Sequence, residues 1–229
     1  MKPLVAILSH SGANDTIARH WPYFLKAEAD LLLVGRVNTH CVFPTEAPGR
    51  KIYRIDSGTE AHADGANHIL RFLDVIRKFL QSPAFADYDV LVVTEYDSIW
   101  LGPIPDPPGV PDGIHAYLAG GHEPMRDSRW YSTRFVHTPW MMNRATAEKV
   151  FTIGHRLLRA NLIEHGFIDR WLGLIMDLYA IPFHQTQTFS SNSLDTAPFM
   201  AAARTAVKCG AWYVHGVKTQ EQLDTLLAP

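Results

Sequence analysis

Short apolar runs alternate with amphipathic segments along the first hundred residues of the chain. The runs Leu4–Leu8, Asp30–Val34 and Lys51–Ile55 predict strands. Within 66–81, apolar residues recur at helical spacing with charged residues between them, which predicts an amphipathic helix. The next run, Asp89–Thr94, is β-branched or Leu from Val90 onward, as expected for a strand buried on both faces. Strands interleaved with helices are typical of an α/β fold with a mainly parallel central sheet flanked by helices.

The second half of the chain predicts further strands and helices around a long aperiodic stretch. Strands are expected at 114–119, 135–142 and 181–188, and helices from Asn143 or Thr146 through Arg159, at 168–179, at 197–207 and over the last ten residues. The stretch 120–134 is polar and aromatic without a period, which indicates a functional loop or a poorly packed excursion. Because no Pro/Gly/Ser-rich linker divides the chain, we expect one domain over 1–229.

Composition narrows the classes of function. With 47% apolar and 19% charged residues, the 229-residue chain is expected to be globular, and a formal charge of -2 carries no electrostatic signature of nucleic-acid binding. No run approaches the roughly 20 apolar residues of a membrane span, and the run LVAIL is too short for a signal peptide. Only Cys41 and Cys209 are present, which favours reduced thiols and a cytoplasmic location.

Two carboxylates follow the most buried predicted strand. Glu95 and Asp97 come directly after Thr94, and Gly102 and Pro103 soon end the segment. Ligands of open α/β sheets bind at the carboxyl edge of the strands, and carboxylate oxygens suit Mg or Mn. The alternative is that both acids are solvated side chains at the end of a strand.

Around these acids the sequence resembles a known family. YDVLVVTEYDSIW, preceded by NHILRFLDVIRKFL, is similar to the D-x-D region of GT-A fold glycosyltransferases, which bind a divalent metal and a nucleotide-diphosphate sugar. FVHTPWMMNRATAEKV, HGFIDRWLGLI and WYVHGVK resemble later segments of that family in the same order. The resemblance implies a single GT-A-like (Rossmann-like) domain, in which 1–105 binds the nucleotide-sugar and 106–229 binds the acceptor.

The resemblance also implies a metal site built from distant residues. Asp97 is the expected metal ligand, and His215 in WYVHGVK is the residue expected to return to the metal. Glu95 stands in place of the usual Asp of the motif, so we expect it to reach the metal through a water molecule or to contact the sugar or the ribose. Imidazole favours Mn2+ over Mg2+. Gly216 would let the backbone approach a phosphate closely, and Lys218 would neutralise the leaving diphosphate; a buried His and a solvated Lys are the alternatives.

The base of the reaction is expected at the start of a helix. Asp169 stands at the start of DRWLGLIMDLYA, where the resemblance implies a base that takes the proton from the acceptor hydroxyl in an inverting reaction. A helix N-terminus stabilises its ionised form. Asp169 is equally suited to be the N-cap of that helix, and both roles can coexist. A retaining mechanism is left open.

Other candidate residues would contact the substrates. His10, Ser11 and Gly12 follow the first predicted strand, where the family receives the nucleotide; Arg36 and Asp56 follow the next two, as ligand or turn residues. Trp130 and Tyr131 are the preferred contacts for a saccharide or other hydroxyl acceptor, although aromatic residues are more often part of a core.

Two other functions are alternatives to transfer of a sugar. The first is a non-catalytic GT-A-like module that binds a nucleotide or a partner, which Glu95 in place of Asp favours. The second, nucleotidyl transfer, is disfavoured because HSGAND holds one Gly and no Lys or Arg.

Overall fold

We describe the protein from a computed structural model, for residues 2–9, 14–35, 47–56, 66–105, 111–119, 135–160, 168–191 and 194–229. The strands are β1 (Pro3–Leu8), β2 (Asp30–Gly35), β3 (Ile52–Asp56), β4 (Val90–Glu95), β5 (Ser98–Trp100), β6 (Ile114–Ala119), β7 (Phe135–Asn143), β8 (Phe183–Gln185), β9 (Phe189–Ser190) and β10 (Tyr213–His215). The helices are α1 (Asn14–Phe24), α3 (Ala66–Leu80), α4 (Arg144–Arg159), α5 (Ile168–Leu178), α6 (Ala197–Lys208) and α7 (Gln220–Leu227), with 3-10 turns η1 (Leu25–Ala27) and η2 (Pro83–Asp87).

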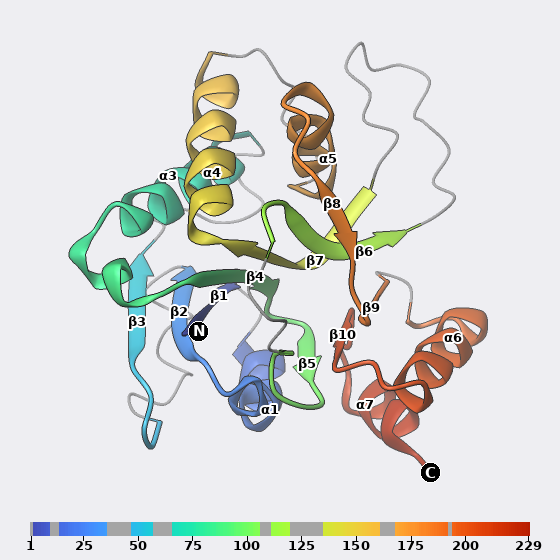
Figure 1. The fold of residues 1–229 in the computed structure, drawn as a ribbon. Coiled ribbons are helices and arrows are strands. Elements are labelled where there is room, and N and C mark those ends of the chain that lie inside the picture. Colours follow the sequence, from blue (N-terminus) through green and yellow to red (C-terminus); the bar gives the residue numbers. More distant parts are fainter. Residues whose placement is uncertain are drawn as a thin grey trace.

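A seven-stranded sheet forms the centre of the molecule (Figure 1), in the order β3-β2-β1-β4-β7-β6-β8. The pairs among β3, β2, β1 and β4 are parallel, as is the pair β6–β8. Strand β7 is antiparallel to both of its neighbours. The prediction of an α/β fold with a mainly parallel sheet is therefore confirmed.

Alternating side chains of the central strands build a core on each face of the sheet. In β1, Leu4, Ala6 and Leu8 pack in the core that α3, α4 and α5 cover, whereas Val5 and Ile7 point to the face of α1. Figure 1 shows these helices as layers on the two sides of the sheet. The long apolar runs of β1, β2 and β4 are explained by this double burial.

A second, three-stranded sheet was not predicted. Its order is β5-β10-β9, with β5 antiparallel and β9 parallel to β10. Helices α6 and α7 pack against it through a third apolar cluster that includes Val214, Leu223 and Leu226. The small sheet lies beside the end of β4 in Figure 1, so it connects the C-terminal segment to the centre of the molecule.

Most predicted elements are present, and one differs. Within 181–188, predicted as one strand, only β8 is a strand, and it pairs with β6; β9 begins after this segment, at Phe189, and pairs with β10. The chain changes sheets between them, so one continuous strand cannot form.

The cysteines and the membrane prediction are only partly addressed by the structure. Cys209 is an exposed free thiol, and Cys41 lies outside the described residues. Among the described helices, none combines the length and the hydrophobicity needed to cross a bilayer.

Candidate metal centre

The carboxyl end of β4 lies where the strand order of the sheet reverses. The chain places β2 and β3 on one side of β1 and then returns to place β4 on the other. Leu8 pairs with Glu95, and Tyr96 donates its backbone N–H to the carbonyl oxygen of Leu8 at 3.0 Å. In open α/β sheets, such a reversal opens a crevice in which ligands bind. Glu95 and the turn after it therefore occupy a position suited to a ligand.

Pairing between β5 and β10 brings the C-terminal segment to this turn. After Tyr96 and Asp97 the chain enters β5, in which Ser98 is opposite His215. The backbone N–H groups of Gly216 and Val217 both donate to the carbonyl oxygen of Asp97, at 3.1 and 2.9 Å. The position of His215 beside the two acids is thus set by backbone pairing.

Glu95, Asp97 and His215 form a compact cluster in which one potential ligand atom from each residue lies within 4.8 Å of the others. His215 Nε2 is 2.8 Å from Glu95 Oε2 and 3.0 Å from Asp97 Oδ1. The side chains of Asp97 and His215 are 4% and 3% exposed, whereas that of Glu95 is 30% exposed. Only Glu95 therefore has substantial contact with solvent.

The cluster is electrostatically coupled. Burial alone would lower the pKa of His215, but the adjacent carboxylates of Asp97 and Glu95 outweigh it and raise that pKa well above 6.5. Burial likewise opposes ionisation of Asp97, yet the charge of His215, with a smaller effect of Lys218, holds the pKa of Asp97 below its usual value. Without a bound cation, the protonated imidazole therefore balances the buried acid.

One oxygen of the cluster has few partners. Asp97 Oδ1 is buried and lies 3.0 Å from His215 Nε2, which also makes a hydrogen bond of 2.8 Å with Glu95 Oε2; no other donor for Asp97 Oδ1 is found among the described residues. A buried carboxylate oxygen with so few donors is uncommon. Two carboxylates and an imidazole are a suitable set of donors for a divalent cation such as Mn2+. The residues present therefore fit a metal ion.

Ser190 holds the imidazole from its other side. Its Oγ lies 2.8 Å from His215 Nδ1, and both residues are buried. When Nε2 offers its lone pair to a cation, Nδ1 carries the proton and donates to Ser190. Such outer contacts fix the tautomer and the orientation of a metal-binding histidine. Sequence reasoning missed Ser190, because its role depends on the pairing of β9 with β10.

A network of hydroxyl groups lies beneath the cluster. The hydroxyl of Tyr213 is 2.6 Å from Ser98 Oγ and 2.8 Å from Thr94 Oγ1, and it donates to Thr138 Oγ1 at 3.3 Å. All four residues are buried. The network joins β4, β5, β7 and β10 and was not predicted; its only signal is the presence of polar residues inside apolar strands.

Gly216 and Lys218 lie in the segment that follows β10. Gly216 is buried and has φ +92°, and a Cβ at this position would overlap the carbonyl oxygen of Ser191. Close packing on Ser191 therefore requires glycine here, a reason different from the predicted approach to a phosphate. Lys218 is exposed, and its carbonyl oxygen accepts a hydrogen bond from Arg19 Nη1 at 2.9 Å. Arg19 thereby holds α1 against this segment.

Of the other predicted site residues, the structure describes Asp56 and the backbone of Asp169. Asp56 is an exposed residue at the end of β3, at the same carboxyl edge as Glu95 but beyond β2 and β1. Asp169 is the second residue of α5, so the helix begins where predicted, but its side chain lies outside what the structure describes. Outside the described residues are also His10, Ser11, Gly12, Arg36, Trp130 and Tyr131.

No protein-family model matches the chain, and a search of curated proteins finds no match to it.

Proposed function

We propose that the chain is a metal-dependent glycosyltransferase of the GT-A type, which moves a sugar from a nucleotide-diphosphate sugar to an acceptor hydroxyl. The observation that carries the proposal is the cluster of Glu95, Asp97 and His215 at the reversal of a mostly parallel sheet. Nucleotides and other ligands bind α/β sheets at that place. A divalent cation held there would neutralise charge on a diphosphate leaving group.

The residues of the chain have distinct roles in this proposal. Asp97 and His215 hold the cation, because they are buried and fixed by the β5–β10 pairing. Glu95 is the more exposed acid and acts either as a third ligand or on a hydroxyl of the sugar or ribose. Lys218, whose charge acts on Asp97, neutralises the diphosphate. Asp169, in the first turn of α5, accepts the proton of the acceptor hydroxyl.

Calorimetry with Mn2+ and a panel of nucleoside diphosphates tests the proposal. We expect at least one diphosphate to bind, and binding to weaken strongly when Mn2+ is replaced by EDTA. Asp97→Asn should abolish the part of diphosphate binding that depends on Mn2+. Asp87→Asn is the control, because Asp87 is an exposed acid that pairs with Lys51 at 3.4 Å, away from the cluster. If no diphosphate binds with or without Mn2+, the proposal is wrong.

Donor hydrolysis separates catalysis from binding. With Mn2+ present and no acceptor, a transferase slowly hydrolyses its own nucleotide-sugar, which identifies the base and the sugar together. Binding without hydrolysis or transfer would favour the non-catalytic module. In the active enzyme, Asp169→Asn should reduce transfer to the acceptor far more than it reduces binding of the diphosphate.

A further inference from the structure

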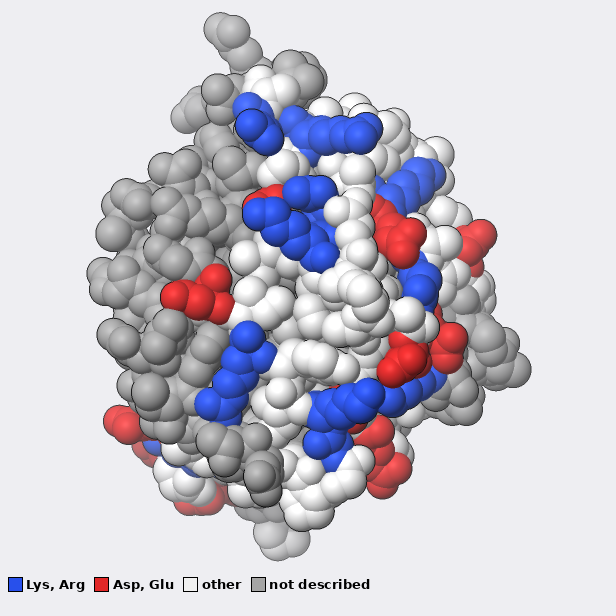
Figure 2. All heavy atoms as spheres, turned by 90° about the vertical axis from the view of Figure 1, so that its left-hand side faces the viewer, with Lys and Arg blue, Asp and Glu red and all other residues white. Residues whose placement is uncertain are grey.

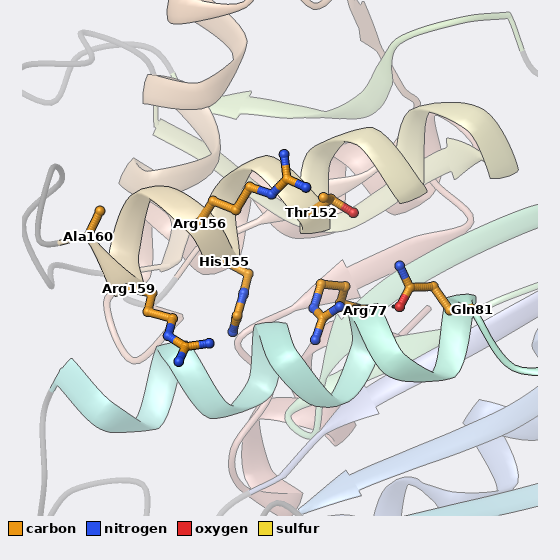
Figure 3. A pocket seen from close by; sticks show the side chains of 7 residues that line it. All are labelled: Arg77, Gln81, Thr152, His155, Arg156, Arg159 and Ala160. Carbon is orange, nitrogen blue, oxygen red and sulfur yellow. Dashed lines mark hydrogen bonds between the residues drawn. The ribbon is translucent and has the colours of Figure 1, made fainter.

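A second site lies between α3 and α4, away from the metal centre. A pocket of about 460 Å3 is lined there by Arg77 from α3, by Gln81 just after the end of α3, and by Thr152, His155, Arg156 and Arg159 from α4. It shares no residue with the cluster of Glu95, Asp97 and His215. Figure 3 shows the two helices running antiparallel, with His155 and Arg159 extending from α4 toward α3, Arg77 on the facing side of α3 and Gln81 at its end.

The lining of the pocket is strongly cationic. It contains three arginines and, among the described residues, no carboxylate. The adjacent Asp74 is already shared by Arg77 and Lys78, each at 2.7 Å, and lies 3.4 Å from His155. Figure 2 shows Lys and Arg side chains close together at the top of the face on which α3 lies. Because the whole chain carries a formal charge of -2, this concentration of positive charge is local.

Arg156 and Arg159 provide accessible hydrogen-bond donors of the pocket. Arg77 Nε is buried and finds no acceptor among the described residues, although the Nη atoms of Arg77 bond Asp74 and Gln81. Arg156 and Arg159 are exposed, and neither makes an ion pair within the described part of the chain. Guanidinium groups present planar pairs of N–H donors that match the oxygens of a phosphate or carboxylate.

Helix stabilisation alone does not explain this arrangement. Arg77, Arg156 and Arg159 lie in the last turns of their helices, where a positive charge interacts favourably with the helix dipole. Because α3 and α4 are antiparallel, however, their C-terminal turns lie at opposite ends of the helix pair. The favourable interaction of each arginine with its own helix dipole therefore does not explain why side chains from both turns line one pocket. Lys208, in the last turn of α6, has the same relation to its helix without lining this pocket.

We propose that the pocket between α3 and α4 binds a small phosphorylated anion through Arg77, Arg156 and Arg159, with Thr152 and Gln81 as additional polar contacts. A volume of about 460 Å3 is sufficient for a ligand that bears one or two phosphate groups. The site is independent of the proposed transferase reaction, so either proposal can fail without the other.

NMR spectra of the arginine Nε–Hε groups, recorded while inorganic pyrophosphate is added in EDTA, test the proposal. We expect saturable shifts of Arg77 and Arg159, which are unchanged in Asp97→Asn because that variant alters only the metal centre. Arg159→Gln should weaken binding roughly tenfold, as expected for the loss of a charge-assisted contact. Lys208→Gln is the matched control, since Arg159 and Lys208 are each the last residue of a helix, and it should leave the affinity within about twofold.

Three outcomes would overturn the proposal. One is the absence of saturable binding of pyrophosphate or inorganic phosphate. Another is equal weakening by Arg159→Gln and Lys208→Gln, which would show a general effect of charge. The third is binding of vesicles that contain phosphatidic acid, in an Arg159-dependent manner, without binding of free pyrophosphate. That result would show that the surface recognises a lipid headgroup and not a free phosphorylated ligand.

Discussion

Gly216 donates its backbone N–H to the carbonyl oxygen of Asp97 at 3.1 Å, and Val217 donates to the same oxygen at 2.9 Å. The cluster of Glu95, Asp97 and His215 is therefore attached to the C-terminal segment through the main chain as well as through side chains.

Substitution of Gly216 should disrupt this attachment. In Gly216→Ala, the new Cβ would overlap the carbonyl oxygen of Ser191 and would also impose strain at φ +92°. Gly210→Ala is the control, because Gly210 has φ +90° and no atom lies within 4 Å of the place that its Cβ would occupy. We expect Gly210→Ala to lower the free energy of unfolding by about 1 to 2 kcal/mol and Gly216→Ala to lower it by more. Equal losses in urea unfolding would contradict the steric explanation.

The buried pair of Asp97 and His215 should be strongly coupled. Removing either partner leaves the other charge buried and uncompensated, so Asp97→Asn and His215→Asn should each lower the free energy of unfolding by about 3 kcal/mol in EDTA. The double variant should lose less than the sum of the single losses, by about 1 to 3 kcal/mol. Unfolding of the four proteins in urea measures this coupling.

An exposed ion pair serves as the comparison for this double-mutant cycle. Lys51 and Asp87 lie 3.4 Å apart with both side chains more than half exposed, at 58% and 60%. Coupling in the cycle of Lys51→Gln and Asp87→Asn should stay below about 0.5 kcal/mol. If the buried pair couples no more strongly than this, the ionic description of the cluster is wrong.

The hydroxyl network under the cluster should contribute to stability. Tyr213→Phe removes the hydroxyl that contacts Thr94, Ser98 and Thr138, while Thr94 and Ser98 keep their mutual hydrogen bond at 2.9 Å. We expect a loss of about 1 to 3 kcal/mol in thermal or urea unfolding. Tyr179→Phe, at a residue that is 41% exposed, should change stability by less than about 0.5 kcal/mol. A neutral Tyr213→Phe would show that the network does not contribute.

His20 should make the fold sensitive to mild acid. Burial lowers its pKa from 6.5 to about 4, against smaller effects of the Tyr96 carbonyl and the charge of Asp97. Between these values the unfolded chain binds the proton and the folded chain does not. The contribution of His20 to the free energy of unfolding is thus fully present above about pH 6.5. It is lost as the pH falls toward 4, by about 3 kcal/mol over the whole range.

The variant His20→Leu isolates this effect. The difference in free energy of unfolding between wild type and His20→Leu should be constant from about pH 7 to 8, where the His20 ring is neutral in both the folded and the unfolded chain. It should then shift in favour of the variant as the pH falls to about 5. A difference that does not change with pH would exclude His20 as the titrating group.

Long periodic segments explain which parts of the fold were predictable. The amphipathic pattern of α3 and the apolar runs of β1 and β4 predicted these elements to within one or two residues, because each pattern repeats over several turns or alternations. Strands β5 and β10 are three residues each, which is too short for a period to be recognised. The small sheet, and the break between β8 and β9 that shortens the strand predicted over 181–188, were missed for this reason.

The candidate site was predictable only in part. Position after a buried strand indicated Glu95 and Asp97, but the residues alone did not indicate that His215 would join them; that expectation came from the family resemblance. Their meeting depends on the register of β5 and β10. Ser190 and Tyr213 could not be identified, since a polar residue in a short apolar run does not indicate which strand it will face.

The separation of 120 residues between Glu95 and His215 has a consequence for the order of folding. Strands β1 to β4 can pair and bury their apolar faces before β10 is synthesised, but the two acids then stand together without the imidazole that balances them. Contacts between residues so distant in the chain form late because closing a long loop is entropically unfavourable. We therefore expect the centre to acquire its third side chain late in folding, so that its affinity for a cation would report that β10 has paired with β5.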